Sequence, residues 1–266
     1  MKKKVKDLLL STKDELVSTA VESETFSELI KTMGETVLSE GVSAILGEIL
    51  GMIAPRINGI RLSYRQKRFE RNIIQEIKVI LDRIELLELK YESLDEKVQE
   101  KFRTIYLWWL SDNVYEEKQE KKISYNVNGY INLMSNESND NLLLMFFNTI
   151  NELTELDIDI LRLYNYDSED NIWDLCKRNN LEPEQTIVIK EKLVRLGLLL
   201  CKNDVQRKSN IDTTIKYLEE LDKDNNKKKP HGVNFPKNKI RKINNSKSYS
   251  ITNLGKNFLR VISADW

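Results

Sequence analysis

The chain has 266 residues, of which 40% are hydrophobic and 32% are charged, and its 42 acidic residues balance its 42 basic ones. Because the charges cancel, attraction to nucleic acid or to an anionic membrane must come from local patches. The single histidine, His231, argues against histidine-based catalysis and zinc sites, and Cys176 and Cys201 are too few for a disulfide framework. Nine glycines and four prolines favour helices over a turn-rich β fold.

Amphipathic helices are expected over residues 5–31, and a glycine-bearing helix over residues 35–54, ended by Pro55. The second helix carries a continuous apolar stripe on one face and small residues spaced by four, which let another helix approach, beside it. The candidate membrane or partner surface therefore consists of Val42, Ile45, Leu46, Gly47, Ile49, Leu50, Gly51 and Ile53.

This helix could be buried in a bundle, lie at a lipid interface or span a membrane. Its five Ile and Leu side chains favour insertion by about 2.5 kcal/mol, and a central Glu48 opposes it by about 3 kcal/mol. The sum is near zero, so a simple span is the least favoured of the three alternatives.

A long helix is expected over residues 61–92, with a near-heptad apolar seam from Phe69 to Leu87. Its first turns are strongly basic, which opposes the helix macrodipole. They form either a solvated face or a contact with anionic lipid or nucleic acid. The candidate anionic-surface contacts are Arg61, Arg65, Lys67, Arg68 and Arg71.

Three further segments complete a helical region over residues 1–150. The pattern predicts a helix at 93–110, with Val98, Phe102, Ile105, Tyr106 and Trp109 facing inward. Residues 121–134 fit either a short helix or a strand. Residues 141–153 are apolar nearly all round, which predicts a buried helix.

The pattern changes at about residue 150. Helices are expected at 156–164, 168–177 (with Ser168 as the N-cap) and 182–196, followed by strands at 198–202 and 248–251 and a last helix capped by Thr252. This order predicts a winged helix-turn-helix domain with a short β-wing over residues 151–266. The expected fold is therefore mostly α, with a helical-bundle or coiled-coil-like N-terminal region.

The wing carries an insertion over residues 202–247. Its first part predicts a small amphipathic helix at 211–223, with Ile211, Ile215, Leu218 and Leu221 on one face. Residues 223–247 hold nine Lys or Arg against one acid, Asp224, which is typical of a flexible basic wing. The candidate phosphate contacts are Lys227, Lys228, Lys229, Lys237, Lys239, Arg241 and Lys242.

Three segments, LTELDIDILRLY, KLVRLGLL and YSITNLGKNFLRVI, resemble the abortive-infection alpha family of bacterial phage-defence proteins. The match covers roughly residues 145–266 and is carried by residues 193–198 and 250–258. The resemblance implies a defence role, a glycine-bearing N-terminal region and a helical middle. It supplies no catalytic residues.

No Walker loop, paired metal-ligand motif or nucleophile elbow is present in the sequence, so we expect neither an enzyme nor a cofactor or metal site. The favoured function is non-enzymatic phage defence through protein or membrane-surface contact, triggered by a phage or host protein. The alternative is a DNA-binding regulator, for which the near-neutral helix at 182–196 is a poor reader. Nucleic acid is thus the less favoured partner.

Self-association of the helical region is expected, because its apolar stripes exceed what one small bundle needs. The apolar run near the start ends at Leu10, too short for a secretory signal. The expected location is the cytoplasm, with the inner face of the cell membrane as the peripheral alternative.

Overall fold

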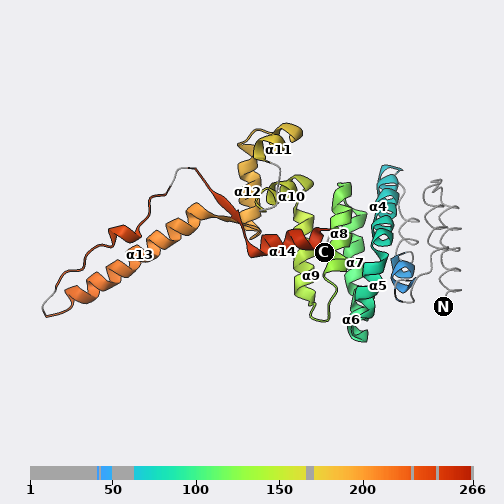
Figure 1. The fold of residues 1–266 in the computed structure, drawn as a ribbon, viewed down its shortest axis with the longest axis horizontal. Helices are drawn as coiled ribbons and strands as arrows, with labels where there is room; N and C mark the ends of the chain where they lie inside the picture. Colours follow the sequence, from blue (N-terminus) through green and yellow to red (C-terminus); the bar gives the residue numbers. More distant parts are fainter. Residues whose placement is uncertain are drawn as a thin grey trace. The chain divides into compact units, whose positions relative to one another are not determined.

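A computed structural model describes residues 41, 43–49, 63–165, 171–228, 231–243 and 246–264. These residues form a mostly helical fold with one two-stranded sheet, which confirms the expected class (Figure 1). The chain divides into two compact units. The first comprises Met1–Leu156 with Phe258–Trp266, and the second comprises Asp157–Asn257.

The first unit is a helical bundle, in which α4, α7, α8 and α9 lie side by side (Figure 1). Its helices are α4 (Ser63–Asp82), α5 (Ile84–Glu92), α6 (Glu96–Lys101), the π-helical turn η1 (Phe102–Tyr106), α7 (Leu107–Tyr115), α8 (Glu120–Asn132) and α9 (Asp140–Glu152). The core takes its largest buried side chains from η1, α8 and α9: Phe102, Tyr106, Tyr130 and Phe147.

The expected long helix is interrupted. It ends as α4 at Asp82 and resumes as α5 at Ile84, because Arg83 leaves helical geometry with φ −118° and ψ 22°. The side chain of Arg83 donates to Asn128 at 2.8 Å and to Asn132 at 3.0 Å. The apolar seam nevertheless faces inward as expected, since Ile73, Ile77, Ile80 and Leu87 are buried.

The helix expected at 93–110 is interrupted by a π-helical turn, which changes the side chains that face the core. A π-helical turn adds one residue to the turn at Phe102–Tyr106 and rotates the following side chains. Tyr106 is buried as expected and Leu107 faces the core beside it, whereas Ile105, expected inside, is 42% exposed. Trp108 is exposed and Trp109 half-buried, as two adjacent indoles on one helix require.

The ambiguous segment at 121–134 is helix α8, and nearly all of it is buried. The expectation of a fully buried helix at 141–153 is wrong in part. Helix α9 buries Leu143, Phe146, Phe147 and Ile150, but its other face exposes Leu142, Leu144 and Met145. Only one side of α9 meets α7 and α8.

Asparagines of α8 hold the C-terminal end of α14 (Asn253–Ile262) within the first unit. Asn128 Nδ2 donates to the carbonyl of Ile262 at 3.0 Å, and Asn132 Nδ2 donates to that of Val261 at 2.8 Å. The last carbonyls of a helix lack intrahelical partners. The two amides, both oriented by Arg83, supply those partners.

The second unit begins with α10 (Glu155–Arg162), most of which belongs to it, followed by α11 (Ile172–Asn179) and α12 (Gln185–Arg195). Asn171, rather than the expected Ser168, caps α11, accepting from the backbone N–H groups of Trp173 and Asp174. Ser168 itself lies outside the described residues. Lys192 of α12 forms a 2.6 Å ion pair with the buried Asp157 of α10.

The two expected strands are confirmed as β1 (Leu199–Cys201) and β2 (Tyr249–Ile251), which pair antiparallel with Leu199 opposite Ile251. Gly197, at φ 74°, ends α12 as expected. Thr252 caps α14, since its hydroxyl oxygen accepts from the N–H of Gly255 at 2.9 Å.

The insertion between the strands differs from the expected wing. Its helix, α13 (Lys202–Asn225), starts at the end of β1 and has 24 residues. Ile211, Ile215 and Leu218, expected on the apolar face of a shorter helix, are 57%, 47% and 54% exposed. The chain then returns alongside α13 to β2 through the short turn η2 (Lys237–Lys239) (Figure 1).

Candidate nucleic-acid interface

The basic segment does not stand free, because its described part is fastened along one face of α13. We call α13 together with the return segment, residues 226–248 apart from 229, 230, 244 and 245, the arm. Four residues of α13 make the fastenings: Asn203, Asn210, Tyr217 and Asp224. They are spaced by seven residues, so they recur every two helical turns, about 10.5 Å along the axis.

The fastenings hold mainly backbone. Asn210 Nδ2 donates to the carbonyl of Arg241 at 2.8 Å, while Asn210 Oδ1 accepts from the N–H of Arg241 at 3.1 Å. Asn203 makes the same two-point contact nearer the strands, with the Ser246 carbonyl and the Ser248 N–H. Because these bonds use the backbone of Arg241, Ser246 and Ser248, they do not occupy the side chains of these residues.

At the far end of α13, Asp224 accepts from the backbone N–H groups of Gly232 at 2.7 Å and His231 at 2.9 Å. Lys227 forms a 3.0 Å ion pair with the same carboxylate. The Lys227 ammonium and the two N–H groups hold the pKa of Asp224 below its usual value. Between these points, the Tyr217 and Phe235 rings meet edge to face at 5.0 Å.

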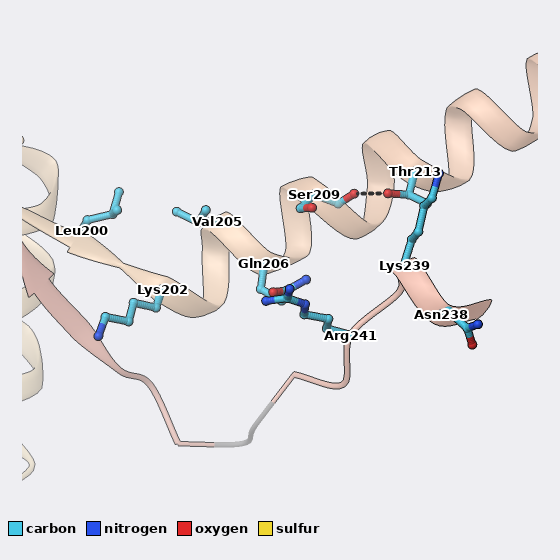
Figure 2. A pocket seen from close by; sticks show the side chains of 9 residues that line it. All are labelled: Leu200, Lys202, Val205, Gln206, Ser209, Thr213, Asn238, Lys239 and Arg241. Carbon is cyan, nitrogen blue, oxygen red and sulfur yellow. Dashed lines mark hydrogen bonds between the residues drawn. The ribbon is translucent and has the colours of Figure 1, made fainter. Parts of the chain in front are cut away.

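A groove of about 590 Å³ lies between α13 and the return segment, at the end nearer the strands (Figure 2). We call it the arm groove. Lys239 and Arg241 reach into it from the return segment toward α13 (Figure 2). The lining residues are Leu200, Lys202, Val205, Gln206, Ser209, Thr213, Asn238, Lys239 and Arg241.

The groove is cationic. Lys202, Lys239 and Arg241 bring three positive charges, and none of the nine lining residues that the structure describes is acidic. Gln206, Ser209, Thr213 and Asn238 add neutral polar groups. The nearby carboxylate of Asp204 is engaged by Arg207 at 3.3 Å. Ammonium and guanidinium groups beside neutral donors are the usual phosphate contacts of nucleic-acid-binding proteins.

Of the seven expected phosphate contacts, the structure brings only Lys239 and Arg241 into the groove. Lys228, Lys237 and Lys242 are exposed elsewhere on the arm, Lys227 pairs with Asp224, and Lys229 lies outside the described residues. Lys202, Gln206, Ser209 and Thr213 were not identified from the sequence. The seven-residue spacing of the fastening residues would have indicated that a segment lies along α13, and hence which face is lined.

Helix α12, the expected reader of a winged helix, is poorly suited to phosphate. Its exposed residues include Ile187, Val188 and Glu191. The Glu191 carboxylate forms an ion pair with Lys247 beside β2. Positive charge is therefore concentrated on the arm rather than on α12.

The candidate membrane helix is only partly described, over residue 41 and residues 43–49, all helical. Ile45, Leu46 and Ile49 are buried, and Gly47 is half-buried. A Cβ added at Gly41 would come within 2.6 Å of the Tyr91 ring, so this helix lies against α5. Val42, Leu50, Gly51 and Ile53 fall outside the described residues.

The basic cluster at the start of α4 is described at two positions. Arg68 lies 3.8 Å from Glu116, and the Arg71 guanidinium donates to Asn72 at 2.9 Å. Both groups thus have contacts within the protein. Arg61 is outside the described residues, as are the side chains of Arg65 and Lys67.

Within the described ranges, no helix is long and apolar enough to cross a membrane, and no cluster of His, Cys, Asp and Glu side chains could hold a metal ion. Comparison with family models, with curated proteins and with solved structures gives no match to this chain.

Proposed function

We propose that the chain is a non-enzymatic nucleic-acid-binding protein whose second unit is a winged-helix-type domain and whose contact with phosphate is made by the arm groove. The observation that carries this proposal is the arm groove, whose lining includes Lys202, Lys239 and Arg241 and no described acid. The element order supports it, with three helices, a strand, an insertion, a strand and a helix.

Binding through this groove contacts the sugar-phosphate backbone rather than base edges. The groove offers three cations and neutral donors, whereas the exposed side chains of α12 are of mixed kind, with apolar Ile187 and Val188, acidic Glu191 and basic Arg195. Backbone contacts bring affinity and strong salt dependence but little sequence selectivity. We therefore expect similar affinity for unrelated sequences.

The test is fluorescence anisotropy with a labelled 25-base-pair duplex of arbitrary sequence, titrated with the full chain between about 50 and 200 mM salt. Replacing Lys202, Lys239 and Arg241 together by glutamine is expected to weaken binding about 100- to 1000-fold. The plot of log affinity against log salt has a negative slope, and its magnitude should decrease by about 3 in this variant. Each lost phosphate contact reduces the magnitude of the slope by about 0.9.

A matched control removes the same charge elsewhere in the second unit. Lys177, Lys216 and Lys223 are exposed and do not line the groove. Their triple glutamine variant should keep most of the affinity. Equal losses in the two triple variants would show diffuse attraction instead of a site, and absence of wild-type binding at about 50 mM salt would refute the proposal.

A second candidate is phage defence through protein contact, as the family resemblance implies. The observation that favours it is exposed apolar surface on the helices before β1, where Trp173 is 68% and Val188 69% exposed. Exposed tryptophans commonly anchor protein interfaces. A phage or host protein would be the trigger, and contact with the inner membrane surface is the peripheral alternative.

This second candidate is tested by plating a panel of phages on cells with and without the protein. Efficiency of plating should fall in its presence and recover in a Trp173→Ser, Val188→Ser variant that accumulates to the same level. Equal plating with and without the wild-type protein across the panel would refute a defence role. Fractionation of infected cells distinguishes the two kinds of contact, because protein bound at the inner membrane surface would be recovered with the membranes.

A further inference from the structure

Helix α13 carries an apolar stripe on a face that the return segment does not use. Ile211, Ile215 and Leu218 follow one another at steps of four and three residues, so they share one side of the helix. They are 57%, 47% and 54% exposed. The same spacing continues to Lys208 on one side and Asp222 on the other, so charged residues end the stripe in both directions.

The charges of α13 are separated along its length. The end next to β1 has Lys202, Arg207 and Lys208 against Asp204. The far end exposes Glu219, Glu220 and Asp222 against Lys223, whereas Asp224 is buried and paired with Lys227. The apolar stripe lies between these two ends.

We propose that α13 pairs with α13 of a second copy of this chain, antiparallel, across Ile211, Ile215 and Leu218. Antiparallel pairing places the basic end of each helix beside the acidic end of the other, near Lys208 and Asp222. Parallel pairing would set like charges side by side at both ends, which is unfavourable. A second copy thus buries the apolar stripe and brings charges of opposite sign to the charges at both of its ends.

The pairing goes beyond nucleic-acid binding and leaves the arm groove open. Successive residues of an α-helix are about 100° apart around the axis. Ser209, which lines the groove, and Ile211 are two positions apart, hence on nearly opposite sides of α13. Each copy in the pair therefore keeps its own groove.

Sedimentation equilibrium of the full chain tests the surface. The wild-type protein is expected to associate at tens of micromolar, and Ile215→Glu is expected to weaken that association at least tenfold. The control Leu89→Glu adds the same charge at an exposed apolar position of α5 and should leave association unchanged. Unchanged circular dichroism of both variants shows that the fold is kept.

Cysteine crosslinking tests the direction. Lys208→Cys and Asp222→Cys are made in separately tagged copies, while the native Cys176 and Cys201 are buried. Mild oxidation should join the 208 variant to the 222 variant and give little 208-to-208 product. A monomeric wild-type chain, association unaffected by Ile215→Glu, or dominant 208-to-208 crosslinks would each overturn the proposal, a monomer leaving the stripe to a different partner.

Discussion

Replacing Glu76 by glutamine is expected to raise the free energy of unfolding of the first unit by about 3 kcal/mol at pH 7. Glu76 lies on α4 at the contact with α7 and α8, is fully buried, and neither carboxylate oxygen has a hydrogen-bond partner. Burial raises its pKa from 4.5 to about 8. The native protein therefore holds a proton on this carboxyl at neutral pH.

The surroundings of Glu76 follow from the helix register. One turn earlier on α4, Asn72 Nδ2 donates to the carbonyls of Val114 at 2.7 Å and Glu117 at 2.9 Å, near the end of α7. Ser111 of α7 and Asn126 of α8 also hold buried oxygens without a hydrogen-bond partner. Glutamine keeps the shape of Glu76 and is neutral without having to take up a proton.

The sign of the pH dependence follows from proton binding. Between pH 4.5 and about 8 the native state holds a proton on Glu76 that the unfolded state has released. Stability therefore falls as pH rises through this window and levels off above it. Because other groups titrate alike in both proteins, the gain from Glu76→Gln should be near zero at about pH 4 and greatest above about pH 8.

Urea unfolding at several pH values, followed by the fluorescence of Trp108 and Trp109 in the first unit, measures this difference. A gain of stability that does not change with pH would contradict a neutral buried Glu76. Glu85→Gln, at an exposed residue of α5, serves as the isosteric control and should leave the free energy of unfolding nearly unchanged.

Replacing Gly255 by alanine is expected to destabilise the second unit by about 2–3 kcal/mol. Gly255 is in the first turn of α14, where an added Cβ would lie 2.3 Å from the carbonyl oxygen of Leu198 and 2.9 Å from Ile251 Cγ1. The Leu198 carbonyl cannot move freely, because it accepts from the backbone N–H of Thr252 at 3.1 Å. Relief of the clash must separate α14 from the strand pair.

A loss of stability in Gly255→Ala would distinguish this position from an ordinary helical glycine. Elsewhere in a helix, glycine to alanine stabilises by roughly 1 kcal/mol. Hydrogen exchange at the amides of β1 and β2 should therefore speed up in Gly255→Ala, while the exposed neighbour Asn257→Ala should leave protection nearly unchanged. Equal or greater protection in Gly255→Ala would show that the corner is looser than the structure describes.

Much of the secondary structure could be predicted from the sequence because it depends on local signals. The near-heptad seam from Ile73 to Leu87 predicts the buried face of α4 and α5. Gly197 and Thr252 mark the end of α12 and the start of α14. The apolar segments around Leu199 and Ile251 predict the strand pair. In each case the responsible residues are neighbours in the chain.

Other features depend on contacts between distant residues, which only the tertiary structure supplies. Arg83 breaks the long helix where its side chain donates to Asn128 and Asn132, over 40 residues away. The pattern of apolar residues alone does not predict that α9 packs on only one side. It also does not predict that Ile211, Ile215 and Leu218 remain exposed. Burial depends on the partner, not on hydrophobicity alone.

Some features of the candidate site could likewise be predicted from the sequence, and others only from the tertiary structure. Composition by itself identified the basic segment and, within it, Lys239 and Arg241. Only the tertiary structure decided that these two line a groove together with Lys202, since Asn203 and Asn210 fasten a return segment that is separated from them by more than 30 residues. Lysine and arginine content determines the charge of a segment, whereas long-range backbone hydrogen bonds determine which charges converge.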